Sequence, residues 1–114
     1  MNLAQIVDQL HLTLLTEPRD LTELQPSGGY TSDLLSCVMS GAKQRSLWVT
    51  LQAHGNIVAV AALLDLCAVI ITEGAQPEPA TIEKANQEGI ILLSTNEPSF
   101  AVVGKLWEIG LRSC

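Results

Sequence analysis

The sequence predicts an α/β protein, a single-domain layered sandwich over residues 1–114 in which helices flank a mostly parallel sheet. Three observations predict this fold class. Helix-like and strand-like segments alternate along the chain, residues 46–71 follow the order strand, turn, helix, strand, and residues 68–71 and 90–93 are apolar throughout. A strand–helix–strand unit gives parallel strands with a right-handed crossover, and continuous apolar strands indicate a sheet covered on both faces.

The chain is expected to begin with a helix over residues 3–10. Asn2 is placed to cap this helix, and its apolar side chains recur at the spacing of one helical face. Residues 11–15 are expected to form a strand. Residues 16–25 are charged and contain a proline, which is typical of a loop.

A Pro-Ser-Gly-Gly cluster follows and interrupts regular structure. Residues 29–32 are then expected to be extended. Ser32 or Asp33 is placed to cap a helix over residues 34–40. Gly41 is expected to end that helix, as glycine often does just beyond a last turn.

The central unit starts with a strand over residues 47–51. Residues 52–56 form a polar turn, in which Gly55 bends the chain and Asn56 is placed to cap the next helix. Residues 57–64 are eight consecutive apolar residues. Because a helix turns by about 100° per residue, they cannot all face one sheet. The surplus is either buried under a neighbouring helix or forms a surface for self-association, and the stripe at issue comprises Ala59, Val60 and Ala62.

The last third of the chain is expected to contain two more helices with a strand between them. Pro79 marks the start of the first, Gly89 ends it, and its modest apolar face comprises Ala80, Ile82 and Ala85. The strand over residues 90–93 and a polar turn lead to a final helix over residues 99–112. The residues at core spacing in that helix are Phe100, Val103, Trp107 and Leu111.

The charge and the cysteines exclude several classes of protein. The net charge is −6, from 12 acidic and 6 basic residues, which argues against nucleic-acid binding and against an anionic membrane surface. No apolar stretch is long enough to span a membrane. Three scattered cysteines indicate reduced thiols in the cytoplasm, with Cys37 and Cys67 in the core and Cys114 exposed. Neither a metal site nor a cofactor is expected.

Polar residues stand at the ends of the predicted strands. Ligands of parallel α/β sheets gather outside the carboxyl ends of the strands. A small-ligand site is therefore expected at this edge, with candidate residues Thr50, Gln52, His54, Asn56, Thr72, Glu73, Ser94 and Thr95.

His54 has two interpretations. Imidazole titrates near neutral pH and can donate or accept a hydrogen bond, so His54 is a candidate ligand contact. Alternatively, it bonds the backbone and fixes the junction between strand and helix. As a general base it would need an orienting partner, for which Asp33 and Glu73 are candidates. A small enzyme that uses His54 as acid or base is therefore an alternative function.

The glycines before Tyr30 also have two interpretations. Backbone amides at Gly28, Gly29 and Tyr30 are candidates for contacting a phosphate, and a tight turn is the alternative. No phosphate-binding loop ending in Gly-Lys-Ser or Gly-Lys-Thr occurs in the sequence. A phosphotransferase activity is therefore not expected.

Several stretches of the chain resemble the DRTGG domain family. They are Gly29–Ser36 (GYTSDLLS), Trp48–Ala61 (WVTLQAHGNIVAVA), Glu83–Ala85, Gly89–Ile90 and Leu92–Thr95. The block 48–61 is the most specific, and the resemblance covers nearly the whole chain. The literal string Asp-Arg-Thr-Gly-Gly is absent, and only Gly28-Gly29 corresponds to its end.

This resemblance implies a role. Similar modules stand beside catalytic or sensor domains in phosphotransacetylases and in pyrophosphatases with CBS domains, and the amino-terminal domain of HPr kinase is similar as well. The resemblance therefore implies a non-catalytic regulatory or ligand-sensing module that acts as a homodimer and binds a small ligand such as a nucleotide. Some small members accompany iron-only hydrogenase genes, so a structural partner of a redox enzyme system is a further alternative.

Overall fold

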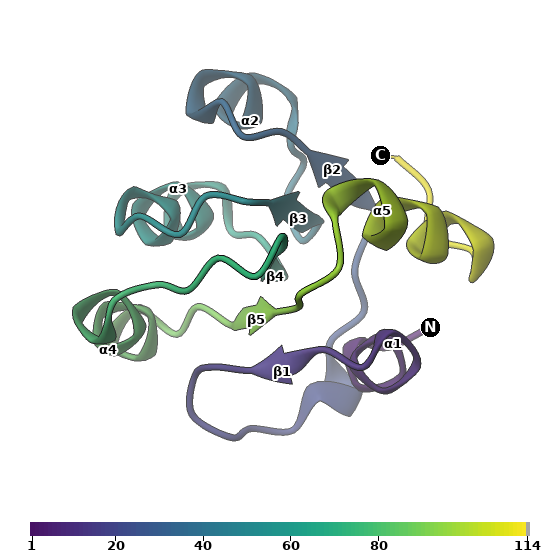
Figure 1. Ribbon diagram of the computed structural model, residues 1–114, viewed down its shortest axis with the longest axis horizontal. Helices are drawn as coiled ribbons and strands as arrows, with labels where there is room; N and C mark the ends of the chain where they lie inside the picture. Colours follow the sequence, from purple (N-terminus) through teal and green to yellow (C-terminus); the bar gives the residue numbers. More distant parts are fainter. Residues whose placement is uncertain (114) are drawn as a thin grey trace.

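The computed structural model describes residues 1–113, and Cys114 lies outside the described residues. A five-stranded sheet forms its centre (Figure 1). The strands are β1 (Thr13–Leu14), β2 (Gly29–Thr31), β3 (Leu47–Thr50), β4 (Ala68–Ile71) and β5 (Leu92–Ser94). Their order across the sheet is β1-β5-β4-β3-β2, and only the pairing of β1 with β5 is antiparallel. The predicted mostly parallel α/β sandwich is confirmed.

Helices cover both faces of the sheet (Figure 1). One face carries α2 (Leu35–Gly41), α3 (Asn56–Leu64) and α4 (Pro79–Glu88), and the other carries α1 (Leu3–Leu10) and α5 (Ser99–Glu108). A short 3₁₀ turn, η1 (Leu21–Glu23), interrupts the loop after β1. The three crossovers between β2 and β5 all use the same face, so these strands have no point at which crossovers diverge to opposite faces.

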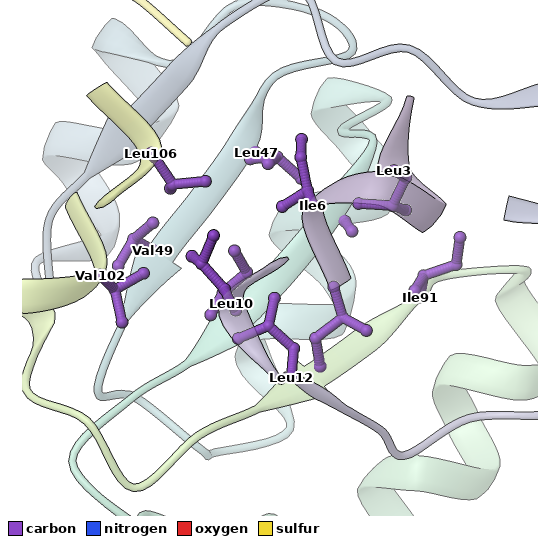
Figure 2. Close-up of a cluster of buried hydrophobic side chains, with 12 residues drawn as sticks. Leu3, Ile6, Leu10, Leu12, Leu47, Val49, Ile91, Val102 and Leu106 are labelled. Atoms are coloured by element: carbon purple, nitrogen blue, oxygen red, sulfur yellow. The ribbon is translucent and has the colours of Figure 1, made fainter. Parts of the chain in front are cut away.

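Each face of the sheet has its own apolar core. Figure 2 shows the core under α1 and α5, where Leu3, Ile6, Val102 and Leu106 pack on strand residues such as Val49. On the opposite face, the buried Trp48 packs with residues of α2, α3 and α4. Strands β3 and β4 are buried along their whole length, as expected for a sheet covered on both sides.

Three helix ends follow the local sequence signals. The Asn2 side chain accepts a hydrogen bond from the Gln5 N–H, and the Gln5 side chain accepts one from the Asn2 N–H, which completes a capping box. Pro79 opens α4, and Gly89 ends it in the left-handed conformation at φ 71°. These predictions are confirmed, and each of these helix ends depends on groups within a few residues of each other.

The ends of α2 differ from the prediction. Leu34 is the N-cap of α2, and no side chain accepts a capping hydrogen bond there. The Asp33 carboxylate instead accepts hydrogen bonds from Thr50 and Leu51 at the end of β3. Gly41 is the last helical residue and does not follow the helix. A methyl group on Gly41 would lie 2.5 Å from the Tyr30 hydroxyl oxygen, so glycine is needed there for close packing.

The final helix presents a different face to the sheet from the predicted one. Val102 and Leu106 are buried, whereas Phe100 is 92% exposed and Trp107 is 53% exposed. The other two predicted positions hold in part, because Val103 and Leu111 pack partly buried against the same core, although Leu111 lies beyond the end of the helix at Glu108. The Ser99 N–H donates to the Glu73 carboxylate, which fixes where the helix begins. This contact joins the loop after β4 to the start of α5, and the apolar spacing of the helix does not reveal it.

Two predictions about burial hold in part. In α4, Ala85 is buried as predicted and Ile82 is partly buried, whereas Ala80 is exposed and Thr81 is buried. Cys67 is partly buried against the core, whereas Cys37 is exposed, so the prediction that both lie in the core is wrong for Cys37. Within residues 1–113, no helix combines the length and the apolar character that crossing a membrane requires.

Candidate functional site

The carboxyl ends of the parallel strands meet at one edge of the sheet. The fold brings most of the predicted site residues to this edge, as the strand–turn pattern implied. They are Asp33, Thr50, Gln52, His54, Asn56, Thr72, Glu73, Ser94 and Thr95.

One group of these residues ties the end of β2 to the end of β3. The Thr50 hydroxyl, which is buried, donates to Asp33 Oδ1 at 2.9 Å, and the Leu51 N–H donates to the same oxygen at 2.8 Å. The Gln52 N–H donates to the Thr50 hydroxyl oxygen, and the Gln52 side-chain amide donates to the Asp33 carbonyl. These polar groups therefore hold neighbouring loops together.

A second group ties the end of β4 to the start of α5. The buried Thr72 hydroxyl lies 2.6 Å from the Ser99 hydroxyl and 3.3 Å from the Thr50 carbonyl oxygen. The Glu73 carboxylate accepts from the Ser99 N–H at 2.9 Å, where an acidic group interacts favourably with a helix N-terminus. Glu73 itself has the left-handed backbone conformation, with φ 63°.

His54 is bonded to its own turn. Its Nδ1 accepts a hydrogen bond from the Asn56 N–H at 3.1 Å. Asn56 is the first residue of α3 and Gly55 is its N-cap, so the prediction that Asn56 caps this helix is wrong. The imidazole of His54 satisfies the free N–H of Asn56 at this helix start. The carboxylates of Asp33 and Glu73, which were candidate orienting partners for His54, accept hydrogen bonds from Thr50, Leu51 and Ser99.

The three remaining predicted site residues lie at the start of β2, away from the carboxyl edge. Gly29 and Tyr30 are strand residues and do not form the predicted tight turn. The Gly28 carbonyl accepts from the Leu47 N–H, and the Gly29 N–H donates to the Arg112 carbonyl. The Tyr30 hydroxyl donates to the Cys37 carbonyl at 3.0 Å.

An open pocket of about 310 Å³ lies at the opposite, amino edge of the sheet. It contains Arg19, Arg45 and the thiol of Cys67, and Arg19 donates to the Gly89 carbonyl at the end of α4. Burial raises the pKa of Cys67 to about 11, although the two arginines oppose this shift. Cys67 therefore remains a neutral thiol at physiological pH.

A pocket of about 580 Å³ lies at the carboxyl edge where β5 meets β1. It includes Ser94 and Thr95 of the predicted site. The sequence reasoning missed its other polar residues, which are His11, Thr13, Gln76, Asn96, Glu97 and Lys105. Asn96 and Glu97 belong to the polar turn that the sequence indicated, but only the pairing of β1 with β5 brings His11 and Thr13 beside them.

The charges in this pocket are nearly balanced. Lys105 Nζ lies 3.7 Å from Glu97 Oε1, and both side chains are about half exposed. His11 ends α1 in the left-handed conformation, with φ 55°. Among the described residues, no cluster of three His, Cys, Asp or Glu side chains is arranged to hold a metal ion. The pocket can therefore offer hydrogen bonds and one mobile cation to a polar molecule.

Comparison with solved structures identifies a protein of the same fold. The chain superposes on the regulatory region of the pyrophosphatase of Clostridium perfringens, which comprises CBS and DRTGG domains and was solved with its activator, diadenosine tetraphosphate. The TM-score is 0.71 at 20% sequence identity. The match covers 90% of this chain but 44% of that chain, so this protein spans less than half of the pyrophosphatase region. The likeness is one of fold and is consistent with the resemblance to the DRTGG family. No family model and no curated protein sequence matches the chain.

Proposed function

We propose that this protein is a non-catalytic regulatory module that senses a small ligand, such as a nucleotide, at the carboxyl edge of its sheet and acts as a homodimer. The observation that carries the proposal is the fold likeness, over 90% of the chain, to a regulatory region. That region was solved with a dinucleotide activator, which suggests the ligand class.

The pocket between β5 and β1 is the place where such a ligand would bind. The hydroxyls of Ser94 and Thr95 and the amides of Gln76 and Asn96 match the donors and acceptors of a nucleobase or a ribose. Within residues 1–113, Lys105 forms one ion pair, with Glu97, which is long and exposed. Such a pair is weak, so the ammonium group can turn toward a phosphate. By contrast, the side chains of Asp33, Thr50 and Thr72 bond within the protein.

A thermal-shift screen of nucleotides tests this proposal. A ligand that binds only the folded state at about 100 times its Kd stabilises that state by about 2.7 kcal/mol, so the melting temperature must rise. The panel comprises ATP, ADP, AMP and diadenosine tetraphosphate. We expect the shift to be smaller in Lys105→Gln and unchanged in Lys84→Gln, which removes the same charge from an exposed position on α4. The absence of a shift with every member of the panel would contradict nucleotide sensing.

Helix α3 is the proposed dimer surface. Leu63 is 69% exposed, and Ala59 and Ala62 are exposed beside it. Val60, which the sequence placed in the same stripe, is buried within the monomer at 7% exposure. The exposed apolar surface of α3 is therefore smaller than the eight-residue apolar run suggested. It consists of Ala59, Ala62 and Leu63 on one side of the helix.

Two glutamate substitutions test the dimer surface. Leu63→Glu is expected to give a folded monomer, because the side chain points away from the core of its own chain. Val60→Glu places a charge in the core and is expected to unfold the chain. Analytical ultracentrifugation with circular dichroism separates the two results. A wild-type protein that sediments as a monomer at high concentration would rule out the homodimer.

A further inference from the structure

An apolar groove of about 290 Å³ lies beside β2, on the face of the sheet that carries α1 and α5. Thr31 and Val49 form its strand wall, and Val103 and Trp107 of α5 form the opposite wall. The chain after α5 closes one end with Leu111 and Arg112. This groove shares no residue with the pocket proposed for the nucleotide.

Two residues of β2 shape the floor of the groove. Gly29 has no side chain, and Leu111 packs so closely over it that a Cβ at this position would lie 3.3 Å from Leu111 Cδ2. The side chain of the next residue, Tyr30, points to the opposite face, where its hydroxyl bonds the Cys37 carbonyl. Two helices cover five strands on this face, whereas three cover the other face, so β2 lies at the margin of α5 (Figure 1).

One cation stands at the end of the groove. The guanidinium carbon of Arg112 lies 4.4 Å from the centroid of the Trp107 ring, and its Nη1 donates to the Trp107 carbonyl. The backbone of Arg112 is held in turn, because its carbonyl accepts from the Gly29 N–H. Within residues 1–113 Arg112 has no ion pair, and its other guanidinium nitrogens have no hydrogen-bond partner. Its guanidinium at the end of apolar walls makes Arg112 complementary to the anionic group of a ligand, although the net charge of −6 opposes the approach of anions at long range.

We propose that this groove binds a small aromatic acid, with its ring between the strand wall and α5 and its carboxylate on Arg112. A cavity of about 150 Å³ already admits benzene, so 290 Å³ is large enough for two fused rings. The planar guanidinium matches a carboxylate in a two-bond geometry. A rigid ring loses less conformational freedom on binding than an acyl chain of the same size, which favours the aromatic ligand.

The two tryptophans provide the measurement. Trp107 is exposed at the groove, whereas Trp48 is fully buried on the other face and serves as an internal reference. Titration with naphthoate is expected to change the Trp107 emission with one site per chain. Replacing Trp107 by Phe is expected to abolish this response, and calorimetry with the same variant measures any binding that is left.

Three variants and a neutral analogue test the assignment. Arg112→Gln is expected to weaken naphthoate binding about tenfold, since a hydrogen-bonded charge is lost. Gly29→Val forces Leu111 out of its place in the groove wall and is expected to abolish binding, and thermal unfolding verifies that both variants fold. Lys84→Gln removes an exposed charge on α4, on the opposite face of the sheet, and is expected to leave the affinity unchanged.

Naphthalenemethanol has the same rings without the carboxylate and is expected to bind at least about tenfold more weakly than naphthoate. Equal affinities for the two compounds, or an unchanged affinity in Arg112→Gln, would overturn the role of Arg112. Full binding in Gly29→Val would overturn the groove as the site. Both results are independent of the nucleotide screen, so the two proposals fail separately.

Discussion

The carboxyl edge of the sheet and the groove beside β2 differ in how their functional groups are satisfied. At the carboxyl edge, Thr50, Thr72 and Asp33 bond to neighbouring loops and to each other. Beside β2, apolar walls face open space, and within residues 1–113 two guanidinium nitrogens of Arg112 have no hydrogen-bond partner. Polar residues at strand ends thus support the fold, while the groove beside β2 is bounded by apolar side chains that do not fill it.

This difference shows why residue type alone is a poor guide to a binding site. Hydroxyls and carboxylates at strand ends suggest ligand contacts, yet the same groups are well suited to closing turns and capping helices. The groove beside β2 depends instead on how α5 packs on the sheet, which leaves Trp107 at the surface as part of an apolar wall.

The two tryptophans give the largest expected effect. Trp48→Ala is expected to cost about 3–5 kcal/mol, because a fully buried ring and its hydrogen bond to the Ser32 carbonyl are lost. Trp107→Ala is expected to cost less than about 1 kcal/mol, since the ring is about half exposed. Urea denaturation measures both. Equal losses of stability in the two variants would mean that Trp107 contributes to the core as much as Trp48 does. The groove would then not differ from the core of the protein in the way described.

Removing a hydroxyl from the carboxyl edge is the next test. Thr50→Val keeps the shape of a buried side chain but deletes the donor to Asp33 and the acceptor for the Gln52 N–H. We expect a loss of about 2 kcal/mol. Thr13 is exposed, and its side chain makes no hydrogen bond within the described residues. The control variant Thr13→Val is therefore expected to change the free energy of unfolding by less than about 0.5 kcal/mol. A similar small change in Thr50→Val would show that this edge is not held by its hydrogen bonds.

His54 is expected to have a smaller structural effect. His54→Ala removes the acceptor for the Asn56 N–H at the start of α3, which is comparable to losing a helix cap and should cost about 1 kcal/mol. Chemical denaturation gives the value. A cost above about 3 kcal/mol would mean that His54 belongs to a larger buried network. If nucleotide affinity falls while stability changes by about 1 kcal/mol, His54 is also a ligand contact.

Cys67 at the amino edge gives the smallest effect and a test of burial without hydrogen bonding. Its pKa is raised to about 11 by burial, so the folded protein holds the thiol proton more tightly than the unfolded chain. The contribution of this tighter proton binding to the free energy of unfolding is fully present below about pH 9 and is lost as the pH rises toward 11. Because the thiol is only partly buried, the loss is expected to reach about 1 kcal/mol. The difference between the wild-type and Cys67→Ala curves of unfolding free energy against pH isolates this contribution, and parallel curves would refute it.

The sequence by itself determined the elements with local causes. The capping box at Asn2, the opening of α4 at Pro79 and its end at Gly89 depend on groups within a few residues of each other. The alternation of helix and strand, with apolar strands at β3 and β4, predicted the parallel sheet and the edge at which its polar loops gather. Nine of the twelve candidate site residues lie at that edge.

Only the tertiary structure decided how those residues are used. Whether Asp33 caps its own helix or bonds to Thr50 depends on the distance between β2 and β3. The apolar spacing of α5 does not identify its buried residues, Val102 and Leu106, which pack against α1 and the sheet. The pocket between β5 and β1 joins residues from opposite ends of the chain. Hydrogen bonds and hollows of this kind form between segments distant in sequence, so no local pattern of residues specifies them.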